Sequence, residues 1–301
     1  MQGERNGLAP YLADENNKIM IGKGAQVVVD WLTTNLSGFF DVVSAVLQSS
    51  IDAILWLLLG TFTEETAFHP YYPFVVIAAF CAIAWGVRRN FSVVVMTAAG
   101  LLLIYNQQYW TEAMETLALV LAATGVSMVI GVPVGILAAR RAWVYSILRP
   151  ILDLMQTIPT FVYLIPALIL FGLGAVSGLV ATVIFAIPAP IRLTRLGIIS
   201  TPPSLIEAAQ AFGANPMQIL TKVELPFALP QIMAGITQTI MLSLSMVVIA
   251  SMVGADGLGT LVQRALGQMN VPMGFDSGMC IVILAIILDR IFKFFDEGET
   301  A

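Results

Sequence analysis

The chain has 301 residues, of which 58% are hydrophobic and 11% are charged, and its mean hydropathy is +0.88. Soluble domains carry about 25% charged residues, so this composition excludes a soluble enzyme. The formal net charge of −5 also argues against a protein that binds nucleic acid.

The negative charge is concentrated in the first 70 residues, which hold three basic and eight acidic side chains, whereas the rest holds eleven of each. We therefore divide the chain into an acidic external head, 1–70, and a transmembrane domain, 71–301. In the head, polar residues recur three or four positions apart at Ser37, Asp41, Ser44, Gln48 and Asp52. This spacing predicts an amphipathic helix on the outer membrane surface. The alternative is an eighth span over about 43–62, which would place Asp52 at the centre of the bilayer.

Seven apolar runs are long enough to be considered as membrane-spanning helices. They cover 72–87, 91–106, 113–139, 151–173, 177–198, 229–254 and 276–294. If the C-terminus is inside, ten of the 14 basic residues fall at the inner loops and span ends. Because Lys and Arg are enriched in cytoplasmic loops, we expect an all-α protein with its N-terminus outside and its C-terminus inside.

Neither a catalytic centre nor a metal site is expected. His69 is the only histidine, and Cys81 and Cys280 lie inside apolar runs, where packed free thiols are expected. The sequence lacks the G-x-x-x-x-G-K-[ST] loop that would hold ATP.

Ionisable residues of the predicted spans lie near the span ends, at Glu112, Glu115, Asp153, Arg192, Arg195, Asp289 and Arg290. Ion-coupled carriers usually place carboxylates or histidines at span centres, so this pattern disfavours such a carrier. That class stays open, because unwound backbone can also bind ions.

Two polar groups within the apolar runs are candidates for lining a solute pathway. The first comprises Gln156, Thr157, Pro159 and Thr160, and the second comprises Gln238, Thr239 and Ser243. Proline also frees backbone groups, so a pathway that bends is one interpretation of the first group. Ordinary packing is the other interpretation, because Pro and Gly are common in membrane helices.

The segment 199–228 predicts a helical hairpin on the cytoplasmic face. Ser204 and Glu207 have the spacing of a capping box, and Gly213 fits the left-handed position that ends a short helix. Asn215 is then expected to cap a second helix. A short exposed helix with small residues can dock closely into a groove on a partner.

This segment resembles the EAA loop of permease subunits of ATP-binding-cassette importers. The residues Glu207-Ala208-Ala209, Gly213 and Val223-x-Leu225-Pro226 match the pattern E-A-A-x₃-G-x₉-I-x-L-P, with valine in place of isoleucine. The resemblance implies a type I importer permease fold. It also implies residues that couple the chain to an ATPase subunit: Glu207, Ala208, Ala209, Gly213, Leu225 and Pro226.

The resemblance extends over about 155–259 and the acidic head, where the chain is similar to the permease of glycine betaine and proline betaine importers. Their wider group carries osmolytes and quaternary amines, including choline, carnitine and trimethylamine N-oxide. One departure is Asp256, at a position where these permeases commonly have glycine.

The resemblance implies a non-catalytic, multi-pass subunit of the bacterial cytoplasmic (inner) membrane that works by alternating access. Its implied partners are membrane lipid, a second copy of the chain, an ATPase subunit that holds ATP and Mg, and an external substrate-binding protein. No cofactor on this chain and no nucleic acid partner are expected. Two alternatives stay open: an importer permease for another small solute such as an amino acid, and an ion-coupled secondary transporter.

Overall fold

The computed structural model describes residues 21–60 and 71–293. Within these ranges the chain forms helices and no strands. The helices are α2 (Ile21–Asn35), α3 (Ser37–Leu59), α4 (Tyr72–Arg88), α5 (Phe91–Asn106), α6 (Trp110–Arg140), α7 (Ala142–Thr157), α8 (Phe161–Phe171), α9 (Ala175–Ala186), α10 (Pro188–Ile199), α11 (Pro203–Ala211), α12 (Pro216–Ile219), the π-helix η2 (Leu220–Glu224), α13 (Leu225–Ser251), α14 (Leu258–Gln268) and α15 (Val271–Phe292). The division at residue 70 stays a prediction, and His69 lies outside the described residues.

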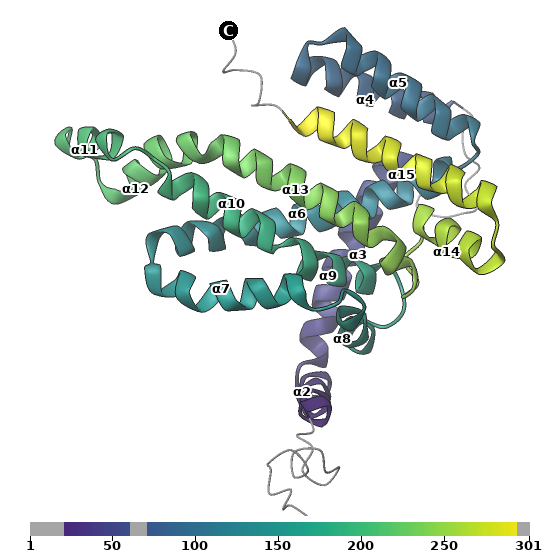
Figure 1. Cartoon of the computed structure of the whole chain (residues 1–301), viewed down its shortest axis with the longest axis horizontal. Coiled ribbons are helices and arrows are strands. Elements are labelled where there is room, and N and C mark those ends of the chain that lie inside the picture. The colour runs from purple at the N-terminus through teal and green to yellow at the C-terminus, as the bar shows by residue number, and fades with distance from the viewer. Residues whose placement is uncertain (1–20, 61–70, 294–301) are drawn as a thin grey trace, which may run out of the picture.

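The centre of the bundle is formed by α6, α10 and α13 (Figure 1). Small residues allow these helices to approach closely, as is typical of membrane proteins. A Cβ atom at Gly135 of α6 would lie 2.8 Å from the carbonyl oxygen of Ile191 in α10. A Cβ atom at Gly197 of α10 would lie 2.9 Å from the Cβ of Ala228 in α13. The two contacts leave no room for larger side chains at these crossings.

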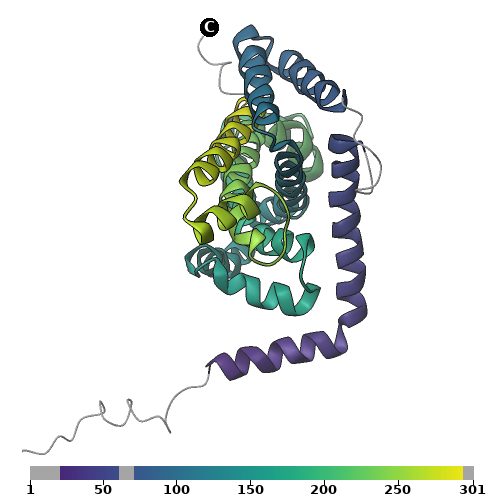
Figure 2. The same cartoon turned by 90° about the vertical axis from the view of Figure 1, so that its right-hand side faces the viewer.

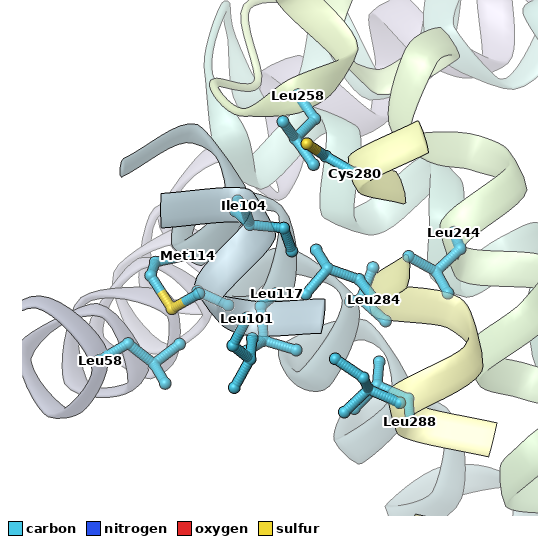
Figure 3. Close-up of a cluster of buried hydrophobic side chains, with 14 of the residues drawn as sticks. Leu58, Leu101, Ile104, Met114, Leu117, Leu244, Leu258, Cys280, Leu284 and Leu288 are labelled. Carbon is cyan, nitrogen blue, oxygen red and sulfur yellow. The ribbon is translucent and has the colours of Figure 1, made fainter. Parts of the chain in front are cut away.

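A large apolar cluster joins α5, α6 and α15 on one side of this centre (Figure 3). Its fully buried members include Leu101, Ile104, Met114, Leu117 and Leu284. Cys280 is buried in the same cluster, and both cysteines are free thiols, which confirms the prediction made from their apolar surroundings.

Five of the described helical segments are long and apolar enough to cross a membrane: Ser37–Leu59, Trp110–Arg140, Ala175–Ile199, Pro216–Ser251 and Val271–Phe292. A sixth candidate is the pair α7 and α8, if the two helices form one span. The predicted spans 72–87 and 91–106 are the apolar helices α4 and α5, with only 17 and 16 residues. The described residues therefore hold five or six segments of spanning length against the predicted seven, and these two shorter helices lie below that length.

The predicted span 151–173 is not one straight helix. Its two helices, α7 and α8, are bent by 101° at residues 158–160. Ile158 precedes Pro159 and has extended backbone angles, φ −66° and ψ 131°. A residue before proline disfavours the helical conformation, which explains why the helix ends here.

The segment predicted as a surface helix forms α3. Its buried residues Leu47, Ile51 and Leu58 pack toward the bundle, and on its polar side Gln48 Nε2 donates a hydrogen bond to Asp52 Oδ1 at 2.8 Å. α3 crosses behind α6 and α13 in Figure 1 and lies along the side of the bundle in Figure 2. α3 is therefore long and apolar enough to be the alternative eighth span. In both figures, however, it runs across the side of the bundle.

Candidate functional site

The segment with the EAA pattern projects from one end of the molecule (Figure 1). It comprises α11, α12 and η2, residues 203–224, and we call it the EAA hairpin. α11 contains no buried residue. The α11 side chains are therefore accessible to a partner and are not needed to fill the core of this chain.

The first helix of the EAA hairpin begins at Pro203 and lacks a side-chain cap. The capping box predicted for Ser204 and Glu207 is therefore wrong. Proline is favoured in the first helical turn because it has no N–H to leave unpaired, and it starts the helix one residue before Ser204. Gly213 follows the helix with φ +78°, which confirms the predicted left-handed glycine.

The second helix is capped as expected. Asn215 Oδ1 accepts a hydrogen bond from the Gln218 N–H at 2.8 Å, and Gln218 Oε1 accepts one from the Asn215 N–H at 2.8 Å. This reciprocal pair is a capping box that fixes the start of α12. The chain then passes through η2 directly into α13, so a displacement of the hairpin acts on a long helix without an intervening loop.

Large apolar side chains lie exposed on the EAA hairpin. Phe212 is 93% exposed and Met217 is 66% exposed, and Leu205 is exposed as well. Ala208 is also exposed and Ala209 is half-buried, so small side chains adjoin these larger ones. Exposed apolar residues gathered on a projecting element are typical of a protein–protein contact.

The EAA hairpin is braced from the end of α6. Arg140 Nη2 lies 2.7 Å from Glu224 Oε2 and also donates to the carbonyl oxygen of Pro216 at 3.1 Å. The Glu224 side chain is only 11% exposed and the Arg140 side chain is 32% exposed, so the carboxylate is the more shielded partner of the ion pair. Sequence reasoning missed this contact, although Glu224 lies inside the EAA pattern, between Val223 and Leu225.

The remaining predicted coupling residues flank this brace. Glu207 is exposed on α11. Leu225 is half-buried and Pro226 is exposed in the first turn of α13. The structure thus places Glu207 on the surface that a partner could contact, and Leu225 and Pro226 at the junction with the bundle.

The first group of pathway candidates lies at the break between α7 and α8. Gln156, Thr157 and Pro159 are exposed, and Thr160 is half-buried. Gln156 also contacts a charged side chain, because its Oε1 accepts a hydrogen bond from Arg192 Nη1 at 2.9 Å. Their part in a pathway stays a prediction.

The second group of pathway candidates is divided between two faces of α13. Gln238 is exposed, whereas Thr239 and Ser243 are buried. The Thr239 hydroxyl donates to the carbonyl oxygen of Gly235 at 2.7 Å within the same helix. Only Gln238 of this group is therefore presented on the surface of the single chain.

Asp256 lies exposed in the turn between α13 and α14. Its neighbours anchor this turn: the Gly174 N–H donates to the carbonyl oxygen of Val253 at 2.9 Å, and the Leu258 N–H donates to Thr116 Oγ1 at 2.8 Å. The turn thus packs against α6 and the segment before α9, and Asp256 stays exposed within it.

Residues 131–298 match the family described as "binding-protein-dependent transport system inner membrane component". A glycine betaine/carnitine transport permease of Listeria monocytogenes is 45% identical over 272 residues, covering 90% of this chain and 93% of that protein. A glycine betaine transport system permease of Bacillus subtilis is 47% identical over 263 residues, covering 87% of this chain and 89% of that protein.

More distant proteins resemble the chain over large parts of its length. A trimethylamine N-oxide transport system permease of Pelagibacter ubique is 33% identical over 271 residues, covering 86% of this chain and 37% of that protein. Among solved structures, the inward-facing methionine ABC transporter MetNI contains a chain that is 29% identical, with a TM-score of 0.54 over 60% of this chain and 92% of that one. The matched part of the chain therefore shares the architecture of a type I importer permease.

Proposed function

The chain belongs to the family of inner membrane components of binding-protein-dependent transport systems, and we propose that it carries a small quaternary-amine or zwitterionic osmolyte inward in an ATP-binding-cassette importer. It is a multi-pass permease of the bacterial inner membrane. The relatives named for glycine betaine, carnitine and trimethylamine N-oxide support this class of solute. Solutes of these types are small amines whose positive charge is balanced by a negative group.

The exposed apolar surface of the EAA hairpin is the observation that carries the proposal. Phe212 is almost entirely exposed beside the small residues of α11. Burying such a ring in a groove of a partner provides the kind of anchor that dominates binding energy at interfaces. The partner is an ATPase subunit, and ATP and Mg bind there rather than on this chain.

The motion of the ATPase subunits reaches the bundle through the EAA hairpin. The Arg140–Glu224 ion pair joins the hairpin to α6, and η2 joins it to α13. Because α6 and α13 both contact α10, a shift of the hairpin acts on the centre of the bundle. Alternating access then consists of a rocking of these helices against those of a second copy of the chain.

An external substrate-binding protein delivers the solute to the opposite side of the membrane. The exposed amides Gln156 and Gln238 line the pathway between the two copies. Both side chains offer hydrogen bonds to a solute that passes between the two copies.

The proposal is tested by purifying the chain together with the ATPase subunit from the cells that produce it and reconstituting both in liposomes with the binding protein. We expect glycine betaine or a similar betaine to stimulate ATP hydrolysis several-fold when it is bound to the binding protein. Stimulation by an amino acid and not by any betaine would place the chain in an importer for another solute. A chain that does not co-purify with an ATPase would contradict the proposal as a whole.

A further inference from the structure

A charged cluster joins α7 to α10 beside the break at residues 158–160. Arg192 Nη2 lies 2.6 Å from Asp153 Oδ1, and Arg192 Nη1 donates to Gln156 Oε1 at 2.9 Å. Arg192 belongs to the candidate span Ala175–Ile199, and the two residues on α7 belong to the bent candidate span. We call these three residues the Asp–Gln–Arg cluster.

The Asp–Gln–Arg cluster is open on one side. The Arg192 side chain is 36% exposed and the Asp153 side chain is 56% exposed in the single chain. Charges within membrane-spanning segments face the interior of an assembly or a water-filled cavity, because exposure to hydrocarbon is costly. Because Asp153 and Arg192 lie near the ends of their predicted spans, the face of α7 and α10 that carries them borders water or the interior of the assembly rather than hydrocarbon.

The open side retains unused binding capacity. A guanidinium group has five N–H donors, and two of its nitrogens provide the contacts to Asp153 and Gln156. Further donors of Arg192 are left for another acceptor, and guanidinium binds a carboxylate through two parallel hydrogen bonds. Asp153 uses Oδ1 toward Arg192, so its Oδ2 remains available to attract a cation.

The backbone beside the cluster is held in place. Tyr163 of α8 donates a hydrogen bond from its hydroxyl to the carbonyl oxygen of Met155 at 2.7 Å. This bond ties α8 to the last turn of α7, which also carries Gln156. Fixed charges and donors of this kind can bind a ligand without first being reorganised.

We infer that the Asp–Gln–Arg cluster is a transient binding site for a zwitterionic solute on its way through the permease, an inference that rests on the proposed function. Arg192 binds the carboxylate or other anionic oxygen of the solute, and Asp153 lies close to its quaternary ammonium group. The solute carries no net charge, and it uses donors of Arg192 and an oxygen of Asp153 that the internal ion pair leaves open. Because Arg192 and Asp153 largely neutralise each other, the solute is held weakly and can leave, as a pathway requires.

The test uses the complete complex in liposomes, with labelled glycine betaine outside and ATP inside. Arg192→Gln and Asp153→Asn are each expected to lower the maximal uptake rate at least tenfold. The concentration for half-maximal uptake should change less than twofold, because the binding protein sets it. ATP hydrolysis should still be stimulated by the loaded binding protein, since the EAA hairpin is untouched. The matched control is Arg141→Gln, at the exposed turn before α7, which should retain wild-type uptake.

Three results would overturn the inference. Uptake within twofold of wild type in either single variant would show that the solute does not need the cluster. Parallel loss of uptake and stimulated ATP hydrolysis would show that the pair only supports the fold. Full recovery in the double variant Asp153→Arg/Arg192→Asp would show that an ion pair of either polarity suffices as a brace. Absence of ATP-driven uptake by the wild-type complex would instead contradict the proposed function.

Discussion

Arg140 and Glu224 are 84 residues apart in the sequence and form an ion pair of 2.7 Å that ties the end of α6 to the π-helix at the base of the EAA hairpin. Arg140 also binds the carbonyl oxygen of Pro216, so one side chain holds both ends of the segment 216–224. π-helical turns are rare and frequently occur at functional sites, which fits the position of η2 at the end of the hairpin, directly before α13.

Removing either partner of this ion pair should impair transmission. We expect the complex to assemble with the Glu224→Gln chain. The free energy of unfolding should fall by about 1–2 kcal/mol, and the amount of solute taken up per ATP hydrolysed should drop several-fold. Arg140→Gln should act similarly. The double variant should lose less free energy of unfolding than the two single variants lose together. Additive effects in this double-mutant cycle would show that the two side chains do not act together.

Phe212 should be an anchor of the contact with the ATPase subunit. Truncation to alanine in Phe212→Ala is expected to weaken binding of that subunit by about 2 kcal/mol or more, which corresponds to roughly 30-fold in dissociation constant. The matched control is Phe91→Ala, since Phe91 is also an exposed phenylalanine but begins α5, away from the hairpin. Equal affinity of the Phe212→Ala and Phe91→Ala chains for the ATPase would remove Phe212 from the interface.

Gly213 should be required for its backbone angle and for the space around it. No atom lies within 4 Å of a Cβ placed there, but φ is +78°. We therefore expect Gly213→Asn, which tolerates left-handed angles, to retain more uptake than Gly213→Ala, which is strained by about 1 kcal/mol. Gly213→Asp should reach the membrane yet uncouple ATP hydrolysis from uptake, because it adds a charge at the docking surface. Normal uptake by the aspartate variant would exclude Gly213 from coupling.

The fold's outline was predictable from sequence wherever a local pattern determines the structure. Gly213 and Asn215 were placed correctly because each acts through its own backbone or its nearest neighbours. Ser204 was misplaced because its capping pattern competes with Pro203, which starts the helix first. The apolar run over 151–173 looked continuous because hydropathy does not register the restriction that Pro159 imposes on Ile158.

The contacts that connect distant segments could not be predicted from one sequence. Arg192 was recognised only as an ionisable residue near a span end, and Arg140 only as one of the ten basic residues at the inner loops and span ends. The structure gives each a carboxylate partner on another helix. Thr239 and Gln238 are adjacent in sequence, yet only the helix rotation in the packed bundle determines that one is buried and the other exposed.

Two glycines of α6 provide a test of the helix packing. Gly135→Ala places a methyl group 2.8 Å from the carbonyl oxygen of Ile191, so we expect a loss of about 1–3 kcal/mol in stability. Gly125→Ala in the same helix meets no atom within 4 Å and should be neutral or stabilising by up to about 1 kcal/mol. Thermal unfolding of the two purified variants in the same detergent measures the difference. Equal melting temperatures would contradict the close approach of α6 and α10.

The most direct test of the central claim is the energy source of uptake. Proteoliposomes that contain the chain, its ATPase subunit and the binding protein should accumulate labelled glycine betaine when ATP is enclosed, and collapse of the ion gradients should leave the initial rate unchanged. Uptake that continues without ATP and stops when the gradients collapse would contradict the assignment of this chain to an ATP-driven importer.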